Sequence, residues 1–86
     1  MKIVEYSEEK REIILLQRGI DMEELADMID NWEYIDILDN KNHPNQKLFI
    51  INYHGYIVCI PYVEDDEKIF LKTAYHDRRY NKKFNS

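Results

Sequence analysis

Two apolar runs on either side of His54-Gly55 constrain the fold more than any other feature of the sequence. The first run extends from Leu48 to Tyr53 and the second from Tyr56 to Val63. A two-residue break that ends in glycine is typical of a tight β-hairpin turn. The second run is apolar on both faces, which predicts a central strand covered by helices on one side and by a partner or the C-terminal tail on the other. Pro61 cannot donate to a strand ladder, so we expect a bulge or a strand end there.

Two helices are predicted ahead of these strands. Ser7 fits the N-cap of a helix that continues to about Arg18, and Gly19 is a natural stop. The segment Asp21-Met22-Glu23-Glu24 has the form of a capping box and predicts the start of the second helix. Apolar residues at three- and four-residue spacing give each helix one buried side. They are Ile13, Ile14 and Leu16 in the first helix, and Met22, Leu25, Ala26, Ile29 and Trp32 in the second.

Three further strands complete the predicted sheet. A short strand is indicated over Met1–Tyr6 and another over Tyr34–Asp39. Polarity alternates from Glu67 to Tyr75, which predicts one continuous strand antiparallel to its predecessor. The order of elements predicts a single α+β domain over residues 1–86, with two N-terminal helices packed on an antiparallel β-sheet and a basic C-terminal tail over residues 76–86.

Charge is distributed unevenly along the chain. The net charge is −5, but residues 67–86 hold six cations and two carboxylates, a net of +4, so residues 1–66 carry −9. Overall acidity argues against an indiscriminate nucleic-acid binder, whose affinity comes from neutralising phosphates. The segregation allows either one basic face on an acidic body or an ordinary solvated C-terminus.

The composition also bounds the environment of the protein. The sequence has no long apolar run and no signal peptide of the charged-then-apolar kind, so we expect a cytoplasmic protein without a membrane partner. Cys59 is the single cysteine, which excludes an internal disulfide. Because it lies within an apolar run, we expect a buried, inert thiol.

Antiparallel pairing would gather polar groups at one end of the sheet. If the strand that ends at Tyr75 pairs with the strand that begins at Tyr56, these two tyrosines lie side by side. His43 and Asp65 then fall at the opposite end. The gathered residues are His54, Tyr56, Tyr75, His76, Arg78 and Arg79.

This set has the groups that RNA cleavage without a metal or cofactor requires. Histidine suits the two proton transfers, and arginine suits the phosphate because its fork can bind two oxygens. Tyrosines can stack on unpaired bases. Each group also has a structural interpretation: His54 tolerates a turn, the arginines bind an acidic partner, and the tyrosines pack. The acidic turn Asp65-Asp66-Glu67 is either a hard-cation site or a solvated turn.

Three segments in order resemble the RelE/ParE superfamily of bacterial toxins, in particular its BrnT-like branch. They are Arg18-Gly19-Ile20-Asp21-Met22-Glu23-Glu24, then Pro44-Asn45-Gln46-Lys47-Leu48-Phe49, and then Pro61-Tyr62-Val63-Glu64-Asp65-Asp66-Glu67-Lys68-Ile69-Phe70-Leu71-Lys72-Thr73. In the closing segment Arg78 and Arg79 match the family's basic pair, Lys82 and Lys83 its later cations, and Phe84 its aromatic residue. Asp77 stands where the family has a small residue, and an acid there would weaken the attraction of Arg78 for phosphate.

The resemblance implies a messenger-cleaving, translation-blocking ribonuclease of a type II toxin–antitoxin system. Its implied partners are RNA, a ribbon-helix-helix antitoxin and, through the antitoxin, operator DNA. The alternatives are a non-catalytic interaction module whose basic tail docks an acidic protein, and a gyrase poison, for which no specific signal is seen. For the ribonuclease we assign phosphate binding to Arg78 and Arg79, and proton transfer to His76, Tyr80 and His54. The further RNA-binding residues are Tyr56, Lys72, Tyr75, Lys82 and Lys83.

Overall fold

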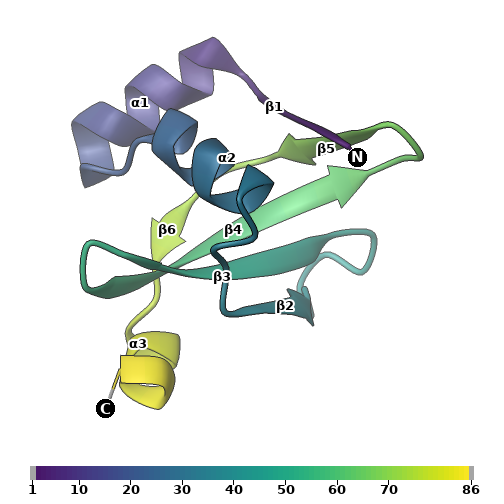
Figure 1. Ribbon diagram of the computed structural model, residues 1–86. Coiled ribbons are helices and arrows are strands. Elements are labelled where there is room, and N and C mark those ends of the chain that lie inside the picture. The colour runs from purple at the N-terminus through teal and green to yellow at the C-terminus, as the bar shows by residue number, and fades with distance from the viewer. Residues whose placement is uncertain (1, 86) are drawn as a thin grey trace.

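The hairpin around His54-Gly55 forms the centre of the sheet in the computed structural model (Figure 1). Its strands are β3 (Lys47–Tyr53) and β4 (Tyr56–Glu64). His54 and Gly55 have φ angles of 54° and 88°, and positive φ at both central residues is what the favoured two-residue turn requires. The Asn52 side chain accepts a hydrogen bond from the Gly55 amide at 3.0 Å. The hairpin prediction is confirmed.

The sheet around this hairpin is mixed. The structure describes residues 2–85, in which the strands lie in the order β1-β5-β4-β3-β2, with β6 beside β4. The other strands are β1 (Ile3–Tyr6), β2 (Asp36–Asp39), β5 (Lys68–Leu71) and β6 (Tyr75–His76). The α+β class is confirmed, but the expected wholly antiparallel sheet is wrong, because β1 runs parallel to β5. Met1 and Ser86, at the ends of the expected first strand and tail, lie outside the described residues.

Both N-terminal helices begin where the caps predict. The Ser7 side chain accepts a hydrogen bond from the Lys10 amide at 3.3 Å and starts α1 (Glu8–Arg18). Gly19 ends α1 in the left-handed conformation, with φ of 68°. The Asp21 side chain accepts from the Glu23 amide at 2.9 Å and starts α2 (Met22–Asp30). In a capping box the Glu24 side chain would accept a hydrogen bond from the Asp21 backbone amide. Here that amide donates to the Tyr53 hydroxyl instead, at 3.1 Å.

The two helices cover one face of the sheet, which we call the helical face (Figure 1). Four residues of α2 are buried there, as predicted: Met22, Leu25, Ala26 and Ile29. In α1 only Ile14 is buried, so the predicted burial of Ile13 and Leu16 is wrong. The reason is that α1 packs beside α2 and presents a narrow stripe to the core. The sheet residues on this face are Phe49, Ile51, Tyr53, Val58, Ile60, Tyr62, Leu71 and Ala74.

Trp32 is exposed, although its spacing from Ile29 predicts burial. Its φ is 60° and its relative exposure is 76%. The Glu33 amide donates to the Met28 carbonyl at 2.8 Å, and the Trp32 amide donates to the Ile29 carbonyl at 3.1 Å. This left-handed residue after a helix end, with a bond reaching back five residues, is a Schellman-type stop. The indole is therefore outside the core, where it lines a surface pocket with Ile29 and Phe49.

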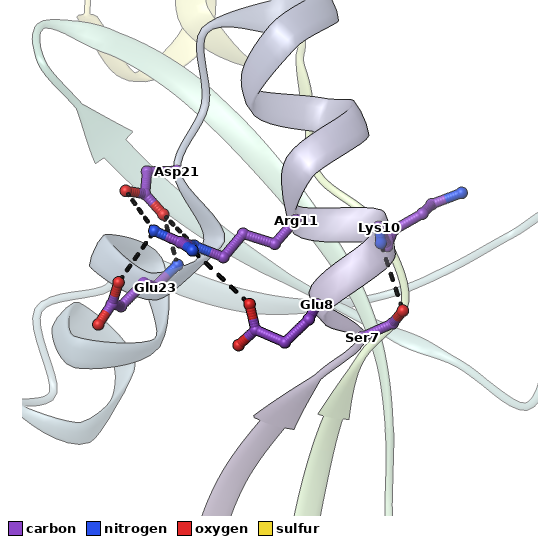
Figure 2. A network of polar contacts seen from close by, with 6 residues as sticks. All are labelled: Ser7, Glu8, Lys10, Arg11, Asp21 and Glu23. Atoms are coloured by element: carbon purple, nitrogen blue, oxygen red, sulfur yellow. Dashed lines mark hydrogen bonds and ion pairs between the residues drawn. The ribbon is translucent and has the colours of Figure 1, made fainter.

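An ion-pair network fixes α1 against the start of α2 (Figure 2). The Arg11 guanidinium lies 3.0 Å from Asp21 Oδ1 and 3.0 Å from Glu23 Oε2. Glu8, one turn before Arg11, lies 3.6 Å from it. The hydrogen bond from Arg11 lowers the pKa of the Asp21 carboxyl, and the Glu23 amide acts in the same direction.

Replacing Asp21 with asparagine should therefore destabilise the fold in a pH-dependent way. Asparagine keeps the N-cap but loses the ion pair, so we expect a cost of about 1 kcal/mol at pH 7. Because the folded pKa of Asp21 is depressed, its contribution is present above the unfolded value and is lost as the pH falls through the folded value. Urea unfolding at several pH values measures the difference from wild type, which should shrink in acid. The control Asp27→Asn, on the exposed side of α2, should cost little at every pH; a pH-independent cost for Asp21→Asn would contradict the assignment.

The strand that pairs with β4 is interrupted opposite Pro61. Between the pairs Tyr62–Leu71 and Cys59–Tyr75, β4 has two residues and its partner has three. The extra residue makes a bulge and shifts the register by one. β4 itself runs unbroken through Pro61, so the bulge or strand end expected at that residue lies in the partner strand instead. The expected continuous strand up to Tyr75 is split into β5 and β6.

Arg18 of α1 stabilises the bulge from the helical side. Its guanidinium donates to the Ala74 carbonyl at 2.6 Å and to the Thr73 hydroxyl at 3.4 Å. A carbonyl freed from the ladder by the bulge thus keeps a hydrogen-bond partner. The bulge sets the direction of the chain that follows it, which carries most of the predicted site.

Candidate nucleic-acid interface

The basic C-terminal segment forms a helix, α3 (Arg78–Asn85), which the sequence analysis does not predict. Asp77 starts this helix: its carboxylate accepts from the Tyr80 amide at 3.1 Å, and its carbonyl accepts from the Asn81 amide at 2.9 Å. A carboxylate is favourable at a helix N-terminus, where it caps amides and faces the positive end of the dipole. Asp77 is buried, so the acid that looked unfavourable for phosphate binding has a structural role.

α3 is amphipathic and packs on the sheet opposite α1 and α2, on what we call the α3 face (Figure 1). Tyr80 and Phe84 are half-buried against a cluster formed by Leu48, Ile50, Ile57 and Cys59. The cations lie on the outer side of the helix, in two pairs one turn apart, and all are exposed. They are Arg78, Arg79, Lys82 and Lys83. Of these, Arg79 lies 3.7 Å from the Asp77 carboxylate, with 89% of its side chain exposed.

Two asparagines fasten α3 to the β3–β4 hairpin. Asn81 accepts a hydrogen bond from the Ile57 amide at 3.0 Å, and the Asp77 amide donates to the Ile57 carbonyl at 3.1 Å. Asn85 donates to the Gly55 carbonyl at 3.3 Å and to the Asn81 side chain at 2.9 Å. Asp77 and Asn81 thus supply hydrogen-bond partners for the backbone amide and carbonyl of Ile57, which no neighbouring strand pairs on that side. These bonds fix the direction in which the cationic side faces.

His76 and Tyr56 lie together on the helical face. His76 is paired with Val58, a helical-face residue, and its ring is 5.3 Å from the Tyr56 ring in an edge-on arrangement. His76 is exposed and Tyr56 is half-buried. Arg78 follows two residues later, so its Cα is at most about 7 Å from that of His76. His76 lies on the helical face whereas α3 packs on the opposite face, so the chain brings the two backbones close together without joining the imidazole to the Arg78 side chain.

His54 belongs to a different set of contacts. Its Nε2 lies 2.7 Å from Glu24 Oε2 on α2, and its ring stands edge-on to the Tyr53 ring at 4.3 Å. The left-handed backbone of His54 serves the hairpin turn. The structure thus joins His54 to α2, whereas it joins His76 to Tyr56.

Tyr75 lies on the opposite face of the sheet from Tyr56. The expectation that these two residues are neighbours is wrong. The pairing of Tyr62 with Leu71 already shifts the register by two residues from the expected one, and the bulge adds a third, which places Tyr75 beside Cys59. There it packs in the cluster beneath α3 with Tyr80. Burial raises the pKa of the Tyr75 phenol, and the nearby Cys59 and Asp77 act in the same direction.

Cys59 is buried at the centre of the α3 face, as predicted. Burial raises the pKa of its thiol to about 12, and the Asp77 carboxylate adds to the rise. Because only the thiolate is nucleophilic, we expect no reaction of the native protein with Ellman's reagent at pH 8. Unfolding in urea should expose the thiol and give one equivalent of product. A fast reaction of the native protein would show that α3 leaves this face readily.

A polar groove next to α3 contains residues that the sequence analysis did not select. Its volume is about 570 Å³, and it lies between the bulge and the loop that joins β2 to β3. Lys72 and Tyr75, both assigned to RNA binding, line it together with Lys10 and His43. His43 was expected at the far end of the sheet from Tyr75; the observed register of β4 with β5 and β6 moves Tyr75 along β4, and the two residues line the same groove. No sequence signal links Lys10 to Lys72, because only the folded chain brings α1 and the bulge to the same groove.

The described part of the chain contains no group of three or more histidine, cysteine, aspartate or glutamate side chains that could hold a metal ion. The Asp65 carboxylate accepts from the amides of Glu67 and Lys68, both at 2.8 Å, and these bonds lower its pKa. Within residues 2–85 no helix has the length and apolarity needed to cross a membrane. In the comparisons with known proteins, no family model, no curated protein and no solved structure matches the chain.

Proposed function

We propose that the protein is a toxin-like endoribonuclease that binds single-stranded RNA through the outer side of α3. The observation that carries this proposal is the set of four exposed cations on one side of α3, with an exposed histidine two residues before the first of them in the chain. Cations arranged along a helix bind successive phosphates of a nucleic-acid backbone. The remaining body of the chain is acidic, which favours this one side as the phosphate-binding surface.

The proposed reaction is transfer of the phosphate to the neighbouring 2′ oxygen. A base removes the 2′-OH proton, the new P–O2′ bond forms, the P–O5′ bond breaks, and an acid protonates the departing 5′ oxygen, which leaves a cyclic phosphate. His76 is the proton-transfer group in this proposal, with Tyr56 orienting its ring. Arg78 and Arg79 stabilise the charge on the phosphorus centre. His54 and Tyr80 are the secondary candidates for proton transfer, and a metal ion has no role.

The partner in this proposal is an acidic antitoxin of the ribbon-helix-helix class that covers α3 and, with the toxin, occupies its operator. Such a partner would compete with RNA for the same cations. The alternative function is a non-catalytic module in which α3 docks an acidic protein and cleaves nothing. It is favoured by the contacts that fix His54 on Glu24 and half-bury Tyr80, since neither group is oriented toward the outer side of α3.

Incubation of the purified protein with single-stranded RNA and a chelator separates the two functions. The ribonuclease should release fragments that end in a cyclic phosphate, and His76→Ala should slow this about 100-fold or more, the usual contribution of a general acid or base. Gln17→Ala, on the exposed surface of α1, is the control and should cleave normally. Intact RNA together with tight binding of an acidic protein would support the module. Undiminished cleavage by His76→Ala would remove His76 from the mechanism.

A further inference from the structure

The groove beside the bulge has the chemistry of an anion site. Its lining contains Lys10 and Lys72, and among the described residues that line it there is no carboxylate. Two other lysines of this chain are neutralised locally: Lys2 pairs with Glu64 at 2.8 Å and Lys68 with Glu5 at 3.3 Å. Figure 2 shows the Lys10 side chain pointing away from the Arg11 network, although the two residues are consecutive. Both lysines also line an adjoining hollow that contains Glu9, and Lys72 Nζ lies 5.6 Å from the centroid of the Phe70 ring there. The lining of the groove itself holds the two lysines and no carboxylate, which favours a phosphate.

The opposite wall of the groove is the β2–β3 loop, residues 40–46, which is held by its own hydrogen bonds. Asn40 is buried, its side chain accepts from the Asn42 amide at 3.1 Å, and its amide donates to the Gln46 carbonyl at 3.2 Å. The Gln46 amide in turn donates to the His43 carbonyl at 2.9 Å. These bonds hold the loop in one shape, so its side chains are positioned before a ligand arrives. Asn42, His43 and Gln46 offer donors and acceptors to the edge of a base.

Tyr75 connects the groove to α3. It lines the groove and, like Tyr80 and Phe84, packs against the buried cluster under α3. The path proposed for a chain of nucleotides bound along α3 runs over Tyr75 into the groove. An aromatic ring at such a point is suited to stacking with an unpaired base. The volume of about 570 Å³ is in the range of small-ligand sites and accommodates one nucleotide.

We propose that this groove binds one nucleotide unit of the RNA, with its phosphate on Lys10 and Lys72 and its base against Tyr75 and the loop. The inference rests on the proposed function for its substrate and adds a subsite that selects for an unpaired nucleotide beyond α3. It accounts for the placement of Lys10, which lies 62 residues from Lys72 in the sequence.

Titration of the isotopically labelled full chain with uridine 5′-monophosphate tests the subsite by NMR. The backbone amides of Asn42, His43, Gln46, Lys72 and Thr73 should shift with a millimolar dissociation constant. Uridine without phosphate should bind at least 10-fold more weakly, and inorganic phosphate should shift the lysine side but leave the loop amides unchanged. No shift of these amides at 20 mM nucleotide would overturn the proposal. Equal effects of phosphate and nucleotide would overturn the part that concerns the base.

Paired variants then relate the subsite to RNA. Lys10→Gln/Lys72→Gln should weaken binding of a 12-nucleotide uridine strand about 10-fold and lower the salt slope by about 1.4, which is 0.7 for each lysine that neutralises a phosphate of a single strand. The control Lys47→Gln/Lys68→Gln removes the same charge outside the groove and should change binding less than 2-fold. Equal losses in the two variants would overturn the RNA subsite. Absence of RNA cleavage by the wild-type chain would contradict the proposed function, whereas absence of the amide shifts would contradict the subsite.

Discussion

A variant with glutamine in place of Arg78, Arg79, Lys82 and Lys83 is expected to bind single-stranded RNA on the order of 100-fold more weakly at physiological salt. The four side chains are exposed on the outer side of α3, so replacing them removes positive charge without altering the core. The docking residues of α3, Tyr80 and Phe84, are unchanged, so the helix should remain on the sheet. Fluorescence anisotropy with a labelled strand measures the affinity, and relief of growth arrest on induced expression measures the effect in cells.

A matched control removes four positive charges elsewhere. It carries glutamine at Lys2, Lys41, Lys47 and Lys68, outside both α3 and the groove. If RNA senses only the net charge of the protein, both variants should lose affinity equally, and α3 would have no special role. If α3 is the contact surface, the control should stay within a few-fold of the wild type. Circular dichroism on both variants checks that the fold is retained.

The largest effect on stability is expected from Ile60→Ala on β4. Ile60 is completely buried on the helical face, and its neighbour across the strand pair is Phe49. Truncating a buried isoleucine removes apolar contacts and leaves a cavity, so we expect a loss of about 3–4 kcal/mol in the free energy of unfolding. For a chain of this size that is a large part of the total stability. Urea unfolding at pH 7 measures it.

Ile13→Ala is the control for this prediction. The side chain is the same, but Ile13 is 41% exposed on α1. Alanine also has the better helix propensity, so the cost should be less than about 1 kcal/mol. Similar losses for the two variants would mean that β4 is not the centre of the core.

Local signals in the sequence predicted the elements well because the caps and the turn are made by neighbours in the chain. Ser7, Gly19 and Asp21 act within one helical turn, and the turn at Gly55 needs only its own backbone geometry. The burial of β4 on both faces followed from its uninterrupted apolar composition. These features do not depend on distant partners, so a single sequence reveals them.

The errors arose where distant residues decide the outcome. The bulge opposite Pro61 depends on β4 and its partner together, and a shift of one residue moves Tyr75 to the other face. The exposure of Leu16 depends on α1 packing beside α2, and that of Trp32 on the left-handed turn after α2. α3 was missed because its apolar side consists of two aromatic residues among many polar ones, and their burial depends on the sheet beneath.

The charged residues of the candidate site could be predicted from the sequence, but their arrangement in space could not. The basic pairs around Tyr80 were identified from composition, and the structure adds that they share the outer side of one helix. The proximity of His76 to Tyr56 and the separation of His54, which contacts Glu24, follow from register and from helix placement. Lys10 and His43 could not be selected from the sequence, because only the fold brings them to the groove.

The most direct test of the claim that α3 contacts RNA is the salt dependence of binding by the wild-type protein. Four cations that each neutralise a phosphate of a single strand predict a slope of log K against log salt of about −2.8, and six, with the groove lysines, a slope of about −4.2. Anisotropy titrations between 50 and 300 mM salt give this slope. A value in that range is expected; a slope shallower than about −1, or no binding at the lowest salt, would contradict the account.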